Sequence, residues 1–343
     1  MMGAINNELI LRKEEIIGKV SSIYFGGGTP SAIEEEKTAS ILETIFDNYE
    51  VDPDAEITLE ANPEDLNPEI LASFRKNGFN RLSLGLQTLD DGLLKFLNRK
   101  HSGKKGKSCF TSAREAGFDN LSVDLIYGIP GSKKSHLIKD LEEVVKLSPE
   151  HVSVYGFTLE EKTVFGAWHK KGRLTTLCED QEAEMFLFVM EWMAAAGYDQ
   201  YEISNYCLPG YESKHNSGYW KGGSYVGVGP GAHSFDQAQR WWNVSNNHRY
   251  MNTIEKGGLP FEFDRRNQKD AVNEYIITSL RIKWGCDLIK ILQMWKIDLL
   301  SIKGLYIEES ITNQTIYKSG NILTLTKSGK LLADHVISGL MIE

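Results

Sequence analysis

Two segments of the sequence hold the residues best suited to binding a small molecule, and the first is a triple-glycine turn at residues 26–30. It follows residues 21–25, which alternate as a half-buried strand does. Glycine lets the backbone adopt conformations closed to other residues, so a ligand can approach closely. The turn matches neither a phosphate-binding loop nor a dinucleotide-binding fingerprint. Because peptide carbonyls accept from an ammonium group and peptide N–H groups donate to a carboxylate, the turn favours a small zwitterion.

The second segment, residues 214–235, combines two histidines with aromatic side chains and six glycines, a mixture suited to a flat ligand. His215 could ligate a haem iron through its neutral imidazole. Tyr219 and Trp220 would supply contact surface with polar edges. The alternative is a hydrogen-bonded histidine in a packed turn, with Trp220 in the core. The residues alone leave both interpretations open.

The elements that must position these residues form repeated parallel β/α units, which place the chain in the α/β class. The clearest helix begins at Pro68, with Asn67 as its N-cap and Gly78 at its end. A second helix, over residues 178–196, carries a Met and aromatic stripe that indicates core packing rather than cofactor contact. The predicted strands are residues 21–25, 55–61, 80–87, 120–130, 151–157 and 200–206.

Polar or glycine residues recur where these predicted strands end. In parallel β/α barrels the carboxyl ends of the strands carry the active site, so side chains from five strands are expected to converge on one ligand. Taken singly, each of them could be a turn residue that only ends its strand. The positions are residues 26–29, residues 60–62, Gln87, Asp124 and Thr158.

After about residue 235 the pattern changes to helices followed by a two-stranded hairpin, which suggests a winged-helix-like domain. We therefore expect a partial β/α barrel over residues 1–235 and a winged-helix-like domain over residues 236–343. Such domains often bind nucleic acid, but no segment here resembles a basic recognition helix. The helical stretches are near residues 269–282 and 288–295, the hairpin spans residues 315–326, and a last helix starts at Lys327.

The composition is that of an ordinary globular chain, with 343 residues, 41% hydrophobic and 25% charged. A net charge of -9 argues against sequence-independent nucleic-acid binding, which needs a basic surface. No apolar run approaches the roughly 20 residues of a membrane span. The first residues lack the apolar core of a signal peptide, so we expect a cytoplasmic protein.

The four cysteines are far apart and form no C-x-x-C pair. Neither a disulfide framework nor a local metal knuckle is indicated by this spacing. Each is predicted to be a small hydrophobic residue of the core. They are Cys109, Cys178, Cys207 and Cys286.

Six ordered motifs resemble the radical-SAM family of oxygen-independent coproporphyrinogen III oxidase-like proteins, and within it the haem chaperones. The resemblance runs from the first predicted helix to the C-terminus. The "EANP" form and "HNSGYW", which matches the haem-associated H-N-x-x-Y-W pattern, favour the chaperones over the oxidases. The motifs are "YFGGGTP", "EANPEDL", "RLSLGLQTLDDGLLKFLNRKHS", "VDLIYGIPG", "HVSVYGFTLE" and "HNSGYW" followed by "GVGPGAHS".

The resemblance implies two sets of ligand-binding residues and no catalytic residue. A carboxylate at Asp124 can accept from ribose hydroxyls, and Arg99 can pair with the carboxylate of methionine. Without the resemblance, Arg99 would be a solvated cation at a helix end, and Glu60 and Asp124 would be turn caps. The implied S-adenosylmethionine residues are Gly27, Gly28, Thr29, Glu60, Gln87, Arg99, Asp124 and Thr158; the implied haem residues are His215, Asn216, Tyr219 and Trp220.

The iron ligand is expected to be His215, although His233 or a cysteine stays open. Members of the family hold a [4Fe–4S] cluster with a C-x-x-x-C-x-x-C loop, and those iron-sulfur ligands are absent from this sequence. We expect an N-terminal truncation just after that loop, with a shortened relative as the alternative. Radical chemistry is not expected from these residues alone.

The function implied by the resemblance is to bind haem and hand it to acceptor haemoproteins, with S-adenosylmethionine as a second small molecule. Partners would then be haem and haemoproteins, including peripheral contact with membrane-bound ones, and no nucleic acid. The enzyme alternative is oxygen-independent oxidation of coproporphyrinogen III. A third possibility is a non-catalytic relative that binds a partner through its winged-helix-like domain.

Overall fold

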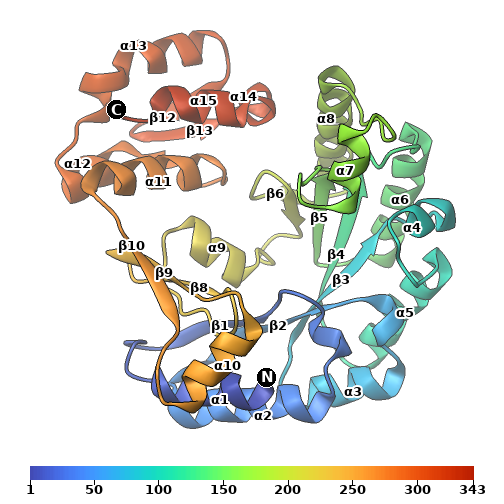
Figure 1. Cartoon of the computed structure of the whole chain (residues 1–343). Helices are drawn as coiled ribbons and strands as arrows, with labels where there is room; N and C mark the ends of the chain where they lie inside the picture. Colours follow the sequence, from blue (N-terminus) through green and yellow to red (C-terminus); the bar gives the residue numbers. More distant parts are fainter. The chain divides into compact units, whose positions relative to one another are not determined.

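The computed structural model describes residues 1–343 (Figure 1). The chain divides into two compact units. The predicted domain boundary at residue 235 stays a prediction. Unit 1 comprises Met1–Tyr24, Glu34–Glu56 and Ser213–Glu343, and unit 2 comprises Phe25–Ile33 and Ile57–Glu212.

The main sheet has seven strands in the order β1-β2-β3-β4-β5-β7-β6. The pairs β2 with β3, β3 with β4 and β4 with β5 are parallel, and a helix follows each of the first four strands. This arrangement confirms the predicted α/β class and five of the predicted strands. The strands are β1 (Val20–Phe25), β2 (Val51–Ala61), β3 (Arg81–Gln87), β4 (Asn120–Tyr127), β5 (His151–Gly156), β6 (Asp199–Gln200) and β7 (Asn205–Cys207).

The sixth predicted strand, residues 200–206, is wrong. The segment splits into β6 and β7, which pair antiparallel with each other, and β7 is also antiparallel to β5. The turn between them is held by Glu202, whose carboxylate accepts from the Ser204 N–H at 3.1 Å and the Asn205 side chain at 2.5 Å. Because this local hydrogen bonding competes with an extended chain, a polar turn replaces the centre of the predicted strand.

The helices of unit 2 cover the sheet, with α5 packed against β3, α6 against β4 and α8 against β5. Asn67 caps α3 as predicted, because its side chain accepts from the Ile70 N–H at 2.8 Å. Val189 and Met193 of α8 are buried, while the rest of its predicted apolar stripe is half-buried. These helices are α3 (Pro68–Lys76), α4 (Asp91–Phe96), α5 (Gly103–Glu115), α6 (Lys134–Leu147), α7 (Val164–Lys170) and α8 (Glu179–Ala195).

The cysteine prediction holds for three residues and is wrong for the fourth. Cys109, Cys207 and Cys286 are buried. Cys178 is exposed, because it lies at the N-cap of α8 rather than on the face that packs against the sheet.

The first part of unit 1 contains four helices and a three-stranded antiparallel sheet of order β10-β9-β8. Helix α1 packs against both α2 and α10. This sheet was not predicted from the sequence, because its strands are short. The elements are α1 (Met2–Leu11), α2 (Glu35–Asn48), α9 (Lys214–Trp220), β8 (His233–Phe235), β9 (Gln239–Asn243), α10 (Asn247–Glu255) and β10 (Phe261–Arg265).

The last part of unit 1 has the helix, strand, two helices and hairpin order of a winged helix, as predicted. Its sheet has the order β11-β13-β12 and is antiparallel throughout. The hairpin turns at Gly320, whose φ is +58°. The elements are α11 (Gln268–Leu280), β11 (Cys286–Asp287), α12 (Leu288–Trp295), α13 (Leu299–Thr312), β12 (Ile316–Ser319), β13 (Ile322–Leu325), α14 (Lys327–Leu331) and α15 (Ala333–Leu340).

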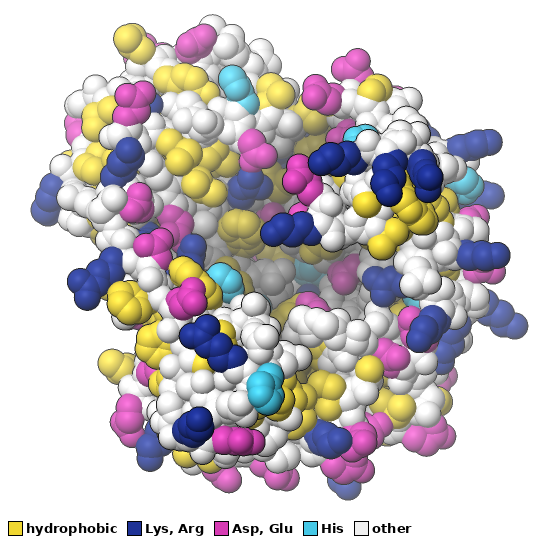
Figure 2. All heavy atoms as spheres, viewed as in Figure 1, with side chains coloured by type: hydrophobic (Ala, Val, Ile, Leu, Met, Phe, Trp, Pro, Cys, Tyr) yellow, Lys and Arg dark blue, Asp and Glu magenta, His cyan; other side chains and the backbone are white.

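Acidic and basic side chains are interspersed on the face drawn in Figure 2, so this face has no large area of one charge.

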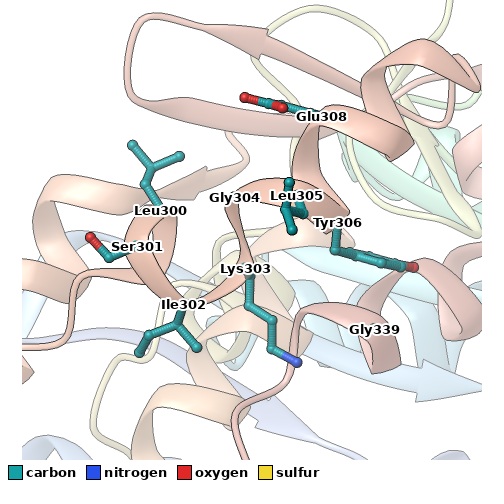
Figure 3. Close-up of a pocket in the computed structure, with 9 residues that line it drawn as sticks. All are labelled: Leu300, Ser301, Ile302, Lys303, Gly304, Leu305, Tyr306, Glu308 and Gly339. Atoms are coloured by element: carbon teal, nitrogen blue, oxygen red, sulfur yellow. The ribbon is translucent and has the colours of Figure 1, made fainter.

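A shallow pocket on α13, lined by residues of that helix and by Gly339, contains none of the candidate site residues named from the sequence (Figure 3). Its lining includes Leu300, Ile302 and Leu305. None of the helices combines the length and apolarity needed to cross a membrane.

Two glycines of the winged-helix-like part give a test of its packing. A Cβ at Gly285, where φ is +75°, would lie 2.4 Å from the Leu323 carbonyl oxygen, whereas one at Gly320 would meet no atom within 4 Å. Gly320→Ala should therefore cost only backbone strain, about 1 kcal/mol. Gly285→Ala should cost about 2–4 kcal/mol because backbone must also move. Urea unfolding followed by circular dichroism measures the difference, and equal costs would contradict this packing.

Candidate functional site

The glycine turn after β1 has an open backbone. Gly27 and Gly28 have φ of +75° and +65°, and a Cβ added at either would meet no atom within 4 Å. Both positions favour glycine because the backbone is left-handed there, and not because neighbouring atoms would clash with a side chain. The Gly27 N–H donates to the Glu60 carboxylate at 3.3 Å, and Thr29 then begins a short 3₁₀ helix at Pro30–Ala32. The turn and the end of β2 therefore form one edge of unit 2.

Three further side chains meet near the ends of β2 and β3. Arg99 donates to the Asn62 side-chain oxygen at 2.7 Å. A Cβ on Gly85 would lie 2.9 Å from Gln87 Nε2 and 3.5 Å from Asn62 Oδ1, so those two side chains flank the same glycine. Gln87 itself has φ of +65°, where the pairing of β3 with β4 shifts register. Strain of this kind at a non-glycine residue is typical of binding sites.

Asp124 lies within β4 rather than at its end, which corrects the predicted position. Its carboxylate is 3.4 Å from the Ser83 hydroxyl of β3, and it also accepts a hydrogen bond from Ser153 of β5. Burial raises the pKa of Asp124 to about 6, partly offset by Ser153 and by the positive charge of Arg81. The negative charge of Glu60 raises the pKa further, so the two carboxylates interact.

Thr158 stands apart from this group. It is exposed, two residues beyond the end of β5, and its hydroxyl donates to the Gly156 carbonyl oxygen at 3.3 Å. Glu60, Gln87, Arg99 and Asp124 thus come from three strands and the loop before α5, while the Thr158 hydroxyl is engaged within its own loop.

The second group of residues lies on α9 in unit 1, and Glu56 of β2 holds the start of this helix. The Glu56 carboxylate accepts from the Ser213 hydroxyl at 3.1 Å, the Lys214 N–H at 3.1 Å and the His215 N–H at 3.0 Å. The Ser213 hydroxyl in turn accepts from the Asn216 N–H at 3.2 Å. Donors at a helix start need such acceptors, so a buried carboxylate fixes α9 to β2.

The His215 ring is held on two sides and is half-buried. It stacks on Tyr24 of β1 with ring centroids 4.4 Å apart and an interplanar angle of 16°. The Tyr219 ring meets it edge-on at 4.7 Å. His215 Nδ1 lies 3.3 Å from the Ser22 hydroxyl. Coordination of iron by Nε2 would leave this hydrogen bond in place, with Nδ1–H donating to Ser22.

The aromatic contact continues beyond His215. Tyr219 is 41% exposed and packs edge-on against Tyr225 at 4.4 Å. Trp220 is half-buried at the end of α9, so it lies neither in the core nor fully on the surface. His233 is exposed, and its ring lies 5.8 Å from that of Trp242.

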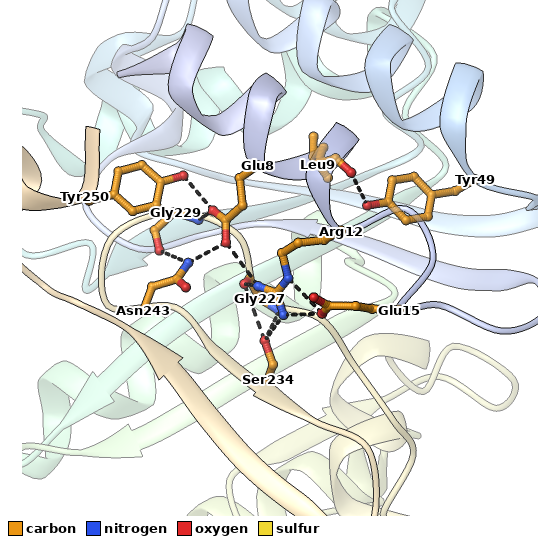
Figure 4. Close-up of polar contacts among 10 residues, drawn as sticks. All are labelled: Glu8, Leu9, Arg12, Glu15, Tyr49, Gly227, Gly229, Ser234, Asn243 and Tyr250. Atoms are coloured by element: carbon orange, nitrogen blue, oxygen red, sulfur yellow. Dashed lines mark hydrogen bonds and ion pairs between the residues drawn. The ribbon is translucent and has the colours of Figure 1, made fainter. Parts of the chain in front are cut away.

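A buried ionic network fixes the glycine-rich loop that follows α9 (Figure 4). Arg12 of α1 donates to the Gly227 carbonyl oxygen at 2.8 Å and to the Ser234 hydroxyl at 3.0 Å. Glu8, which pairs with Arg12 at 3.0 Å, accepts from the Gly229 N–H at 2.8 Å and from the Tyr250 hydroxyl at 2.6 Å. Both charges are buried, so their mutual pairing is what makes them tolerable there.

The residues of the chain fit two of the three groups implied by the sequence. No group of three or more His, Cys, Asp or Glu residues is placed so that it could hold a metal ion. The open glycine turn and the polar residues beside it do fit a zwitterion with hydroxyl groups. His215, with Tyr219 beside it, fits a planar ligand with a central metal.

Comparison with known proteins agrees with this fold. Residues 4–144 match the radical SAM superfamily. The solved structure of coproporphyrinogen III oxidase (HemN) from Escherichia coli, a radical SAM enzyme, is 21% identical, with a TM-score of 0.85 over 99% of this chain and 82% of that chain. The likeness confirms the predicted fold class, a radical-SAM-type partial barrel of the α/β class.

Two curated relatives are closer in sequence, and both are called "Heme chaperone HemW". The one from Mycobacterium tuberculosis (strain ATCC 25618 / H37Rv) is 34% identical over 94% of this chain and 81% of its own length. The one from Bacillus subtilis (strain 168) is 35% identical over 94% of this chain and 86% of its own length. Fold and matches together define a protein of the radical SAM superfamily. Within that superfamily, the chain belongs to the HemW family.

The residues that hold α9 and His215 in place were not predicted from the sequence. Glu56, Ser22 and Tyr24 all contact the start of α9 or His215, but each precedes α9 by more than 150 residues. A signal existed for Glu56, since a charged residue inside an apolar strand needs a partner. Its partner could not be read from the sequence.

The raised pKa of Asp124 predicts a pH-dependent gain in stability for Asp124→Asn. Since the pKa in the folded protein is about 6, above its usual 3.8, folding carries a cost once the carboxylate must ionise. That cost is absent below about pH 4 and complete above about pH 6. The variant should exceed wild type by about 2–3 kcal/mol at pH 8, with the gain vanishing near pH 4.

Urea unfolding of both proteins between pH 4 and pH 8 measures this difference. The matched control is Asp119→Asn, which removes an exposed carboxylate just before the same strand. A pH-independent difference between Asp124→Asn and wild type would contradict the buried environment of Asp124.

Proposed function

We propose that the protein binds haem through α9 and passes it to acceptor haemoproteins. The observation that carries this proposal is the arrangement around His215, whose ring is stacked on Tyr24 and hydrogen-bonded at Nδ1 to Ser22. A histidine fixed in ring orientation and in hydrogen bonding is what an axial iron ligand requires. The name of the two relatives supports the same cargo.

Haem would contact the exposed side of α9. Tyr219, at 41% exposure, offers an aromatic surface next to His215, and Trp220 is half-buried at the end of the helix. Asn216 stands beside His215 on the first turn of α9 and supplies a polar edge. A site on the surface of unit 1 suits a carrier, since the haem must leave it again for an acceptor.

We also propose that unit 2 binds S-adenosylmethionine. Gly27 and Gly28 would present peptide groups to its methionine end, with Thr29 beside them. Glu60, Gln87 and Arg99 would satisfy its amino and carboxylate groups, and Asp124 would accept from a ribose hydroxyl. Thr158 is included only because the resemblance implies it, since its hydroxyl is hydrogen-bonded within the loop after β5. The open glycine turn supports this role, because its left-handed backbone leaves room for a ligand at no steric cost.

The test of the haem proposal is a titration of the protein with haem, followed through the Soret band under reducing conditions. Wild type should give a saturable, roughly stoichiometric shift. His215→Ala should weaken binding at least about tenfold and change the band position, because the iron loses its axial nitrogen. The matched control is His233→Ala, which removes the other histidine of the same segment.

Equal spectra for wild type and His215→Ala, or a change confined to His233→Ala, would show that His215 is not the iron ligand. Transfer is tested by mixing the haem-loaded protein with apomyoglobin and following the spectrum of holomyoglobin. A carrier should release haem to this probe within minutes, whereas a haem that stays bound would contradict transfer.

Equilibrium dialysis with S-adenosylmethionine tests the unit 2 site separately. Asp124→Asn should reduce binding about tenfold, the effect of one lost hydrogen bond to a charged acceptor. The same variant is expected to be more stable than wild type at neutral pH, so lost binding cannot be attributed to unfolding. Unchanged binding in Asp124→Asn would remove Asp124 from the site.

A further inference from the structure

Two arginines and one glutamate form a charged cluster in unit 1, beyond the residues already described. Arg240 of β9 and Arg266, just after β10, both pair with the carboxylate of Glu274 on α11. The distance from Arg266 Nη2 to Glu274 Oε2 is 3.0 Å. Both guanidinium groups also lie over the ring of Phe235, with their central carbons 5.6 Å and 4.9 Å from its centroid.

The cluster has a net positive charge. Two guanidinium groups share one carboxylate, and the Nε–H of each arginine has no hydrogen-bond partner. A buried N–H group without a hydrogen-bond partner costs free energy. Two such groups beside an unbalanced positive charge are therefore unusual in an ion pair that serves stability alone. A second carboxylate would balance the charge, and guanidinium groups bind carboxylates in a paired geometry.

The cluster is connected to His215 by a row of aromatic rings. Phe235 lies 6.0 Å from Tyr225, Tyr225 lies 4.4 Å from Tyr219, and Tyr219 lies 4.7 Å from His215. The Tyr225 hydroxyl is also hydrogen-bonded to Arg240. The row therefore joins the proposed iron ligand to a cationic group without leaving unit 1.

Tyr219 in this row and Arg240 at its end are both accessible to solvent. The Arg240 side chain is 39% exposed and Tyr219 is 41% exposed, whereas the Arg266 side chain is 11% exposed. Arg240 is thus the cation that an incoming carboxylate would meet first, while the less exposed Arg266 lies over the ring of Phe235.

We propose that Arg240, supported by Arg266, is a binding subsite for a propionate carboxylate of the porphyrin whose iron is held by His215. Haem combines a central iron with two carboxylates at one edge of a flat ring. With iron at His215, the ring would lie along Tyr219 and Tyr225, and its carboxylate edge would face Arg240. The proposal rests on the proposed haem function and adds a specificity for porphyrins that carry free carboxylates.

The test compares haem with its dimethyl ester, which keeps the iron and the ring but has no carboxylate charge. Both are titrated in the same detergent into wild type, Arg240→Gln and Arg240→Lys. Wild type should bind haem about tenfold or more tightly than the ester, the effect of one charge-assisted hydrogen bond. Arg240→Gln should lose most of that preference by weakening haem alone, and Arg240→Lys should keep part of it.

The matched control is Arg265→Gln. Arg265 is exposed at the end of β10, and its guanidinium also lies over an aromatic ring, that of Phe263, at 5.9 Å. Its loss should leave the preference for haem over the ester unchanged. Thermal unfolding of each variant shows whether the fold is intact.

The outcomes separate the subsite from the haem function. If wild type binds haem and the ester equally, or if Arg240→Gln weakens both ligands by the same factor, the subsite is wrong and the cluster only joins α11 to β9. If wild type binds neither ligand, the haem function is wrong and the subsite with it.

Discussion

The Glu56 carboxylate is the contact on which the candidate haem site depends. It accepts three hydrogen bonds from the start of α9, and it lies on β2, a strand of the main sheet. Each hydrogen bond to a charged acceptor contributes about 1.5–3 kcal/mol, so the three bonds are comparable in size to the several kcal/mol that burying one carboxylate costs. A short helix of seven residues would not hold its position without such an anchor.

The direction of the His215 ring follows from that anchor. Once the first turn of α9 is fixed, the His215 ring stacks on Tyr24 and lies within hydrogen-bond distance of the Ser22 hydroxyl, both on β1. Tyr219, one turn later on α9, packs edge-on against the same ring. The buried pair of Glu8 and Arg12 then fixes the loop from which Tyr225 and Phe235 continue the aromatic row. A rigid ring orientation is what lets a single histidine select an iron-centred ligand.

Local signals in the sequence predicted a large part of the fold. Asn67 before Pro68, the glycine turn at residues 26–29 and the hairpin around Gly320 each act through neighbouring backbone, so they could be recognised without the fold. Contacts between distant segments could not, as with the Glu8 hydrogen bond to Tyr250, 242 residues along the chain. The predicted strand over residues 200–206 was wrong because local side-chain hydrogen bonds of Glu202 form a turn in place of an extended chain. The motifs predict which residues bind ligands, whereas the contacts that hold those residues in place are seen only in the structure.

Resonance Raman spectroscopy of the ferrous haem complex is the most direct test of the account, because the iron–imidazole stretching band reports the axial ligand itself. Wild type should show this band, and His215→Gly should lose it. Added imidazole, which can fill the space left beside Tyr24 and Ser22, should restore it. A band that persists unchanged in His215→Gly would show that another residue holds the iron, and the central role of α9 would then be wrong.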